Sequence, residues 1–238
     1  MKVIVGIPAR FASTRFPGKP LAMLAGRPML AHVVERAKQA DVGEVLVATD
    51  DARIAEAASS AGAMVRMTHA DHASGSDRLA EAISELDCDI VVNVQGDEPL
   101  INPAAIRAVL EPFAAEPDLP MATLAHPIFE EFQLNDPNAV KVVCDAKGHA
   151  LYFSRAPIPY LRVESATTPL KHVGLYAYRR DFLLHYSSLT PSPLELAEQL
   201  EQLRVLHHGH AIAVTVGDFH CIGIDTPADL ARAEALLA

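Results

Sequence analysis

Three cations and two carboxylates stand where they could act together on a phosphorylated substrate. Arg10, Arg15 and Lys19 fall within ten positions of one another near the N-terminus, while Asp97 and Asp225 each follow an apolar run. Arginine forks suit bidentate contacts to phosphate, and lysine supplies a compact positive charge. Mg²⁺ prefers one or two carboxylates with the remaining oxygens from phosphate and water. Together these residues indicate a site for a polyphosphate and a magnesium ion.

The loop that carries the cations follows residues 2–7, an apolar run typical of a first β-strand. It reads PARFASTRFPGKPL, and its small residues can present backbone N–H groups to a phosphate. It lacks both the GxGxxG fingerprint and the GxxxxGKS/T P-loop, so neither of those nucleotide sites applies. Loop cations are usually only solvated. The carboxyl end of a strand, however, is where open α/β sheets bind ligands, and this position favours a phosphate-binding loop.

The sequence pattern supports a metal-binding role more strongly for Asp97 than for Asp225. Asp97 lies in NVQGDEP, directly after the apolar run 90–94, and is expected at the same sheet edge as the phosphate loop. Asp225 lies in GIDTP, before Thr226 and Pro227. An aspartate at that point is a common helix N-cap, so the pattern alone favours the cap over the metal ligand for Asp225.

The elements that must position these groups alternate between short β-branched runs and longer Ala/Leu/Glu-rich segments. This alternation is typical of βαβ units with a mostly parallel sheet between two helical layers. The sequence predicts strands over 2–7, 44–49, 64–67, 90–94, 121–125, 172–178, 211–216 and 220–224, and a hairpin from 140–144 and 150–154. It predicts helices over 28–39, 51–61, 76–86, 103–115, 179–189, 195–206 and 226–238. Residues 157–170 contain three prolines and are expected to form a protruding loop.

Length and composition limit the class of protein. The 238 residues, half of them hydrophobic, predict one globular domain over 1–238. No stretch approaches the roughly 20 apolar residues of a membrane span, and the N-terminal run is too short for a signal peptide, which predicts a cytoplasmic protein with no membrane partner. The net charge of −10 argues against a nucleic-acid partner. Three widely spaced cysteines favour buried thiols over disulfides or zinc.

Several segments, in order along the whole chain, resemble the 3-deoxy-manno-octulosonate (Kdo) cytidylyltransferases. PARFASTRFPGKPL resembles the N-terminal signature of this family, and NVQGDEP and GIDTP resemble its metal-binding stretches. The resemblance implies a three-layer α/β/α fold like that of nucleotide-diphospho-sugar transferases, with a small protruding hairpin and loop. It also implies Mg²⁺-dependent transfer of CMP from CTP to Kdo for lipopolysaccharide synthesis, and a homodimer. Under this interpretation Asp225 is a metal ligand together with Asp97.

The resemblance also implies roles for individual residues. The catalytic residues would be Arg10, Lys19, Asp97 and Asp225, and the metal ligands Asp97 and Asp225. The nucleotide-binding residues would be Pro8, Ala9, Arg10, Arg15, Lys19, Ser74, Gly75, Arg78 and Asp97, with Ser74, Gly75 and Arg78 in HASGSDR, which resembles the family's HxSGTDR. The sugar-binding residues would be Gln95, Arg155, His172, Tyr176, Glu201 and Gln202.

Structural interpretations compete with several of these roles. Ser74 could be a helix cap, His172 and Tyr176 could be core residues, and Glu201 could lie on a solvated helix face beside Arg204. Under the family interpretation, Arg78 would donate to the cytosine carbonyl and Arg155 would bind the Kdo carboxylate. What favours these roles is the succession of matching segments rather than any single residue.

Other functions remain as alternatives. The nearest is a cytidylyltransferase for a related acidic sugar, either 8-amino-Kdo or sialic acid. Many relatives have a tryptophan where this chain reads LHHG at 206–209, and the chain contains no tryptophan. An NAD-dependent oxidoreductase is disfavoured by the missing glycine fingerprint. A non-catalytic binding domain is disfavoured by the intact set of cations and carboxylates.

Overall fold

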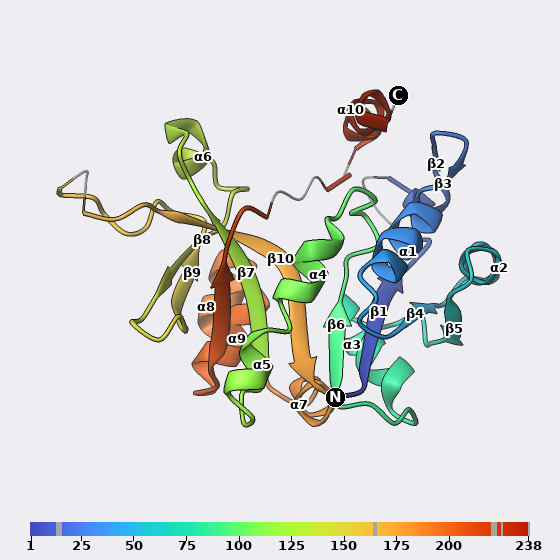
Figure 1. The fold of residues 1–238 in the computed structure, drawn as a ribbon, viewed down its shortest axis with the longest axis horizontal. Helices are drawn as coiled ribbons and strands as arrows, with labels where there is room; N and C mark the ends of the chain where they lie inside the picture. Colours follow the sequence, from blue (N-terminus) through green and yellow to red (C-terminus); the bar gives the residue numbers. More distant parts are fainter. Residues whose placement is uncertain (13–15, 164–165, 220–222, 225, 238) are drawn as a thin grey trace. The chain divides into compact units, whose positions relative to one another are not determined.

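The computed structural model describes residues 1–12, 16–163, 166–219, 223–224 and 226–237. The described chain forms two compact units (Figure 1). Unit 1 comprises residues 1–107, 178–187 and 221–238, and unit 2 comprises 108–177 and 188–220. The expectation of one domain over 1–238 remains a prediction, and a single cooperative unfolding transition would test it.

Unit 1 is built on four parallel strands in the order β6-β1-β4-β5. These strands are β1 (Val3–Ala9), β4 (Glu44–Thr49), β5 (Met64–Met67) and β6 (Ile90–Asn93). A two-residue turn joins β2 (Met23–Leu24) to β3 (Arg27–Pro28) in a separate antiparallel pair. β1 and β6 are almost wholly buried, as expected for strands covered on both faces.

The order of the strands decides which helices cover which face of this sheet. The helices of unit 1 include α1 (Met29–Gln39), α2 (Ala52–Ser60), α3 (Gly75–Ile83), α7 (Arg180–Tyr186) and α10 (Pro227–Leu237). The chain moves from β1 through α1 to β4 and through α2 to β5, then returns through α3 to β6 on the other side of β1. Since such crossovers are right-handed, α1 and α2 cover one face and α3 covers the other. The three-layer arrangement expected from the sequence is therefore present in unit 1 (Figure 1).

Unit 2 mixes parallel and antiparallel strands. Its strands are β7 (Met121–Pro127), β8 (Lys141–Cys144), β9 (Ala150–Ser154), β10 (Leu170–Arg179) and β11 (Ile212–Val216). β11 pairs with β7 in parallel, and β8 pairs in antiparallel fashion with β9 and β10. β8 and β9 form the predicted hairpin, and β10 continues along the chain into unit 1. The mostly parallel mixed sheet expected from the sequence is confirmed.

Two predicted helices are each broken into shorter ones. The helix expected over 103–115 is α4 (Pro103–Ala108) and α5 (Pro112–Ala115), because Pro112 has no N–H and starts a new helix. The helix expected over 195–206 is α8 (Pro193–Glu198) and α9 (Gln202–His207). Gln199 between them has a φ of 53°, the left-handed conformation that ends a helix.

Other differences are smaller. A strand was expected over 220–224; residues 220–222 lie outside the described chain, and Gly223 and Ile224 are irregular. The structure adds a short helix, α6 (Glu131–Asn135), and a 3₁₀ turn at Lys19–Leu21. Of the cysteines, Cys88 is buried and Cys144 partly buried, both as free thiols, and burial raises the pKa of each. No described helix has both the length and the apolar character needed to cross a bilayer.

Candidate active site

Lys19 and Asp97, which are 78 positions apart in the sequence, form an ion pair. The Lys19 ammonium donates to Asp97 Oδ2 at 2.6 Å, and the two side chains are only 13% and 33% exposed. A charge-assisted hydrogen bond of this length is among the stronger polar contacts in a protein. A predicted phosphate-binding cation and a predicted metal-binding carboxylate therefore share one partly buried position.

Two chain segments approach Pro8 near the carboxyl end of β1. A Cβ added to Gly96 would lie 3.0 Å from the Pro8 carbonyl oxygen, and one added to Gly75 would lie 3.0 Å from the Pro8 ring. Most Cβ contacts are longer than this, so glycine at positions 75 and 96 favours the close approach of the backbone. β1 and β6 are neighbours whose connections leave in opposite directions, which is the position where open α/β sheets bind ligands.

The loop between β1 and Lys19 is closed at its base. The Gly18 N–H donates to the Phe11 carbonyl at 3.0 Å, and Gly18 has a φ of 71°, in the left-handed region that favours glycine. A 3₁₀ turn then begins at Lys19. Arg10 is exposed at the start of the loop, next to Ala9 in β1. Arg15 lies outside the described residues, so its predicted phosphate contact stays a prediction.

Asp225, the second predicted metal ligand, also lies outside the described residues, but its neighbours are described. The Ile224 N–H donates to the Asp97 carbonyl oxygen at 2.9 Å. Thr226 caps α10: its hydroxyl accepts from the Asp229 N–H, and the Asp229 carboxylate accepts from the Thr226 N–H and hydroxyl at 2.8 Å. Thr226 is therefore the N-cap of α10, the role that the sequence pattern alone had favoured for Asp225.

The first turn of α3 holds three predicted nucleotide-binding residues. Ser74 is the N-cap and accepts from the Asp77 N–H at 3.1 Å, so its structural interpretation is confirmed. Arg78 is only 3% exposed; it donates to Thr68 Oγ1 at 2.6 Å and lies 3.5 Å from Asp50. Its guanidinium is therefore engaged within the fold, and donation to a cytosine carbonyl remains a prediction.

A series of hydrogen-bonded polar side chains, which the sequence did not predict, lies at the end of β6. Gln95 donates to Asn93 at 3.3 Å, and Asn93 donates to Ser76 at 3.5 Å. Ser76 lies 3.5 Å from the Tyr178 hydroxyl. The available signal was Asn93 itself, because a polar residue in an otherwise apolar buried strand needs partners. This series orients Gln95, the one predicted sugar-binding residue in unit 1.

The other predicted sugar-binding residues lie in unit 2, and Gln202 stands out among them. Its side chain is only 4% exposed, and Nε2 is buried without a hydrogen-bond partner among the described residues. A buried amide donor without a partner costs stability. The contact of Gln202 with the sugar remains a prediction. Glu201, at the start of the same helix, is exposed.

His172 and Tyr176 project from β10, where their rings lie 5.4 Å apart. Thr123 Oγ1 lies 3.0 Å from His172 Nε2 and donates its proton to the Val173 and Leu175 carbonyls. His172 therefore donates through Nε2 to the Thr123 oxygen. Burial lowers the pKa of His172 to about 3, so the ring is neutral at physiological pH. The structural interpretation of His172 is confirmed, and a sugar contact remains a prediction.

Comparison with known proteins decides the family. The family model described as Cytidylyltransferase matches residues 4–212. A 3-deoxy-manno-octulosonate cytidylyltransferase of Solibacter usitatus is 54% identical, the match covering 99% of this chain and 94% of that protein. The chain belongs to the Kdo cytidylyltransferase family. The enzyme of the same name from Syntrophotalea carbinolica is 51% identical, over 100% of this chain and 99% of that one.

A solved structure agrees with this membership. The structure of CMP:2-keto-3-deoxy-manno-octonic acid synthetase complexed with CTP has a TM-score of 0.95 and 47% identity to this chain. The match covers 100% of this chain and 98% of that one. The nucleotidyltransferase-like α/β fold expected from the sequence is confirmed.

The hydrogen bonds of Arg155 differ from the sugar contact that the family resemblance implied. Its three guanidinium nitrogens donate to backbone carbonyls, those of Glu198 at 2.7 Å, Pro137 at 2.9 Å and Gln199 at 3.3 Å. Lys141 is fully buried beneath this segment, and its ammonium donates to the carbonyls of Asp136 at 2.9 Å and Arg155 at 2.5 Å. Burial lowers the pKa of Lys141. Arg155 thus joins chain segments together, and its contact with the Kdo carboxylate remains a prediction.

The carboxylate ligands of the predicted metal site suit a hard cation. Among the described residues there is no cluster of three or more His, Cys, Asp or Glu side chains, which is the arrangement of a preformed protein cage. Asp97 instead offers a single carboxylate, which is paired with the positively charged Lys19 ammonium in this structure. Mg²⁺ commonly binds through one or two carboxylates and takes its other oxygens from phosphates and water, so the residues fit magnesium.

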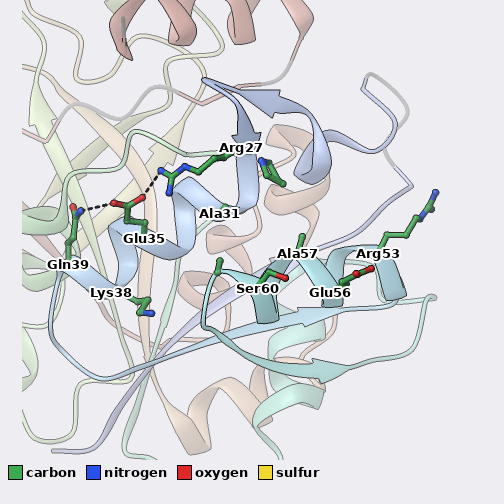
Figure 2. Close-up of a pocket in the computed structure, with 11 residues that line it drawn as sticks. Arg27, Ala31, Glu35, Lys38, Gln39, Arg53, Glu56, Ala57 and Ser60 are labelled. Atoms are coloured by element: carbon green, nitrogen blue, oxygen red, sulfur yellow. Dashed lines mark hydrogen bonds and ion pairs between the residues drawn. The ribbon is translucent and has the colours of Figure 1, made fainter.

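A groove of about 890 Å³ lies between α1 and α2 (Figure 2). Figure 2 shows Arg27 bonded to Glu35, at 2.6 Å, along one wall. None of the predicted site residues lines this groove.

Proposed function

We propose that this protein transfers CMP from CTP to the anomeric hydroxyl of Kdo, giving CMP-Kdo and pyrophosphate. The observation that carries the proposal is the Lys19–Asp97 pair at the carboxyl ends of β1 and β6. Membership of the Kdo cytidylyltransferase family supplies the identity of both substrates. The role in lipopolysaccharide synthesis follows from the product.

The reaction forms one bond and breaks one bond at the α-phosphorus of CTP. The C2 hydroxyl oxygen of Kdo attacks this phosphorus, the bond to the β-phosphate breaks, pyrophosphate leaves with the bonding electron pair, and the hydroxyl proton passes to solvent. Lys19 and Arg10 would bind the triphosphate and stabilise the negative charge that develops on the leaving oxygens. Positioning of the two substrates supplies much of the remaining acceleration.

Mg²⁺ would be bound by Asp97 and Asp225, with phosphate and water oxygens completing its coordination. When bound, the ion would act as a Lewis acid on the phosphoryl group. Two observations support the assignment of Asp225: Ile224, its covalent neighbour, donates to the Asp97 backbone, and Thr226 already caps α10. Lys19, which pairs with Asp97 in the structure, would find a second anionic partner in the triphosphate of CTP.

Recognition of the acidic sugar is proposed for Gln95, Arg155, His172, Tyr176, Glu201 and Gln202. Gln202 Nε2 has no hydrogen-bond partner in the part of the chain that the structure describes, and a ligand oxygen would satisfy it. His172, as a neutral ring, would contribute shape and a fixed orientation for Tyr176 rather than charge.

A grid of nucleotides and sugars tests the proposed function. Pyrophosphate release is measured with CTP, UTP, ATP or GTP against Kdo, 8-amino-Kdo or sialic acid, with and without Mg²⁺. We expect release only with CTP and Mg²⁺, and with Kdo as the preferred sugar. Release with CTP and sialic acid alone, or CTP binding without any turnover, would reject the proposal.

A homodimer and a cytoplasmic location are also proposed. Unit 2 exposes large apolar side chains on its hairpin and on the 157–170 loop, with Leu151, Tyr160 and Val163 each more than half exposed. Exposed apolar groups of this size suit a protein–protein interface. CTP is a cytoplasmic nucleotide, and the reaction needs it as a substrate.

A further inference from the structure

The C-terminal helix α10 closes an apolar cluster in unit 1. Four buried residues form its centre, Leu24, Met29, Ile224 and Ala233. Phe16, Leu100 and Leu230 pack against this centre and are partly buried. We call these seven residues the C-terminal cluster. α10, which supplies Leu230 and Ala233, contacts β2 at the hairpin (Figure 1).

Each chain segment that carries a proposed catalytic group contributes one residue to the C-terminal cluster. Phe16 precedes Lys19 by three positions, and its carbonyl oxygen accepts from the Lys19 N–H at 3.1 Å. Leu100 lies in the tight turn that follows Asp97, where the Ile101 N–H donates to the Glu98 carbonyl at 3.1 Å.

The third segment is the one that carries Asp225. Ile224 is completely buried in the C-terminal cluster, and its N–H donates to the Asp97 carbonyl at 2.9 Å. The segments before Lys19, after Asp97 and before Asp225 therefore share one apolar support.

We propose that α10 is a positioning element of the metal and nucleotide site, and that Leu230 is its positioning residue. This inference rests on the proposed function and adds to it a role for a helix that contributes no proposed catalytic side chain. Leu230 packs against the buried centre of the C-terminal cluster, as do Phe16 and Leu100. Through this centre Leu230 would hold in place the segments that carry Lys19 and Asp97. Side chains in a packed interior respond to the loss of even small groups, because neighbours relax toward the space.

We expect truncation of Leu230 to weaken metal binding more than it lowers the stability of the fold. A Mg²⁺ ion demands near-ideal geometry from its ligands. Displacement of a carboxylate by about 1 Å can lower a rate by about a hundredfold. Leu230 is only partly buried, and we expect the sheet of unit 1 to persist when its side chain is truncated.

The test compares Leu230→Ala with wild type, with Leu230→Met as the conservative variant and with Leu236→Ala as the matched control. Leu236 lies on the same helix and is 64% exposed. Two quantities are measured: the Mn²⁺ dissociation constant in the presence of CTP without sugar, by electron paramagnetic resonance, and the Mg²⁺ concentration that gives half-maximal pyrophosphate release. Circular dichroism checks the fold of each variant.

We expect Leu230→Ala to raise both metal concentrations at least fivefold, Leu230→Met to restore them to within about twofold of wild type, and Leu236→Ala to leave them unchanged. If Leu230→Ala lowers the melting temperature while both metal values stay at wild type, the helix only stabilises the fold and the inference is wrong. If Leu230→Ala does not fold, Leu230→Val, a smaller truncation, is measured in the same way and decides the question. A wild-type protein that binds CTP and Mn²⁺ without producing CMP-Kdo would reject the proposed function, while the binding arm would still test the inference.

Discussion

At the scale of single residues, the decisive feature is that Lys19 and Asp97 meet. Both were expected at the carboxyl edge of the sheet because each follows a buried strand, and the structure places their charged atoms 2.6 Å apart. The sequence could predict this much because parallel strands bring their carboxyl ends to one edge. It could not predict that Arg155 donates to three carbonyls, because those carbonyls come from segments 18 and 44 positions away.

Replacement of Asp97 by asparagine should abolish turnover while the fold persists. The amide keeps the size of the side chain but removes the charge that a divalent ion and Lys19 both need. We expect kcat to fall by at least about a hundredfold, as for loss of a transition-state electrostatic contact. Asp87→Asn, at a 95% exposed carboxylate, is the control and should leave kcat unchanged. Near-normal Mg²⁺-dependent kcat in Asp97→Asn would remove the metal assignment.

His172 should make folding stability depend on pH below neutrality. Its pKa is about 3 in the folded protein and about 6.5 when exposed, so between these values the unfolded chain binds the extra proton. The free energy of unfolding should therefore fall as the pH drops below 6.5, by about 1.4 kcal/mol per pH unit at most. His172→Gln removes this titration. Denaturant unfolding at pH 7.0 and 5.5 should show a smaller loss for the variant; equal losses would contradict the assignment of a neutral buried ring.

At the scale of elements, the strands and most helices followed from hydrophobic periodicity, whereas two helix breaks did not. Pro112 was visible in the sequence and could have marked the end of α4. Gln199 gave no local signal, because glutamine rarely adopts a positive φ and only tertiary packing selects that conformation. The Asp225 cap was a reasonable local expectation that Thr226 fulfils instead, because Asp229 completes a capping box with it.

The start of α8 offers an element-level test. Ser192 accepts from the Glu195 N–H at 3.0 Å, and the Glu195 carboxylate accepts from the Ser192 N–H at 3.1 Å and pairs with Arg204. Ser192→Ala removes one half of this capping box and should lower the free energy of unfolding by about 1 kcal/mol. Ser187→Ala, at an exposed position, should change it by less than about 0.5 kcal/mol. Urea denaturation of both variants measures the difference, and equal values would mean that the cap does not stabilise α8.

At the scale of the whole molecule, the sequence predicted the fold class and the family, because matching segments run from the first strand to the last helix. It did not predict two compact units, because both the boundary near residue 107 and the return of the chain at 178–187 depend on long-range packing. Nor did it identify a surface for a second copy. That surface depends on which apolar side chains the fold leaves exposed.

The proposed dimer should be visible by light scattering. We expect a mass of twice the 25.6 kDa chain at micromolar concentration. Tyr160→Asp, at an 89% exposed site in the loop that was proposed for contact, should shift the population toward the monomer. Met67→Asp, at a 56% exposed site in unit 1, should not. A monomeric wild type, or identical masses for both variants, would reject this surface.

The arrangement of charge around Asp97 is tested most directly by a crystal structure with CTP and Mn²⁺, in which anomalous scattering locates the ion. We predict the ion bound to the carboxylates of Asp97 and Asp225, with Lys19 moved from Asp97 onto the triphosphate beside Arg10. A nucleotide bound elsewhere, or an ion that contacts neither carboxylate while Lys19 stays on Asp97, would contradict the proposed site.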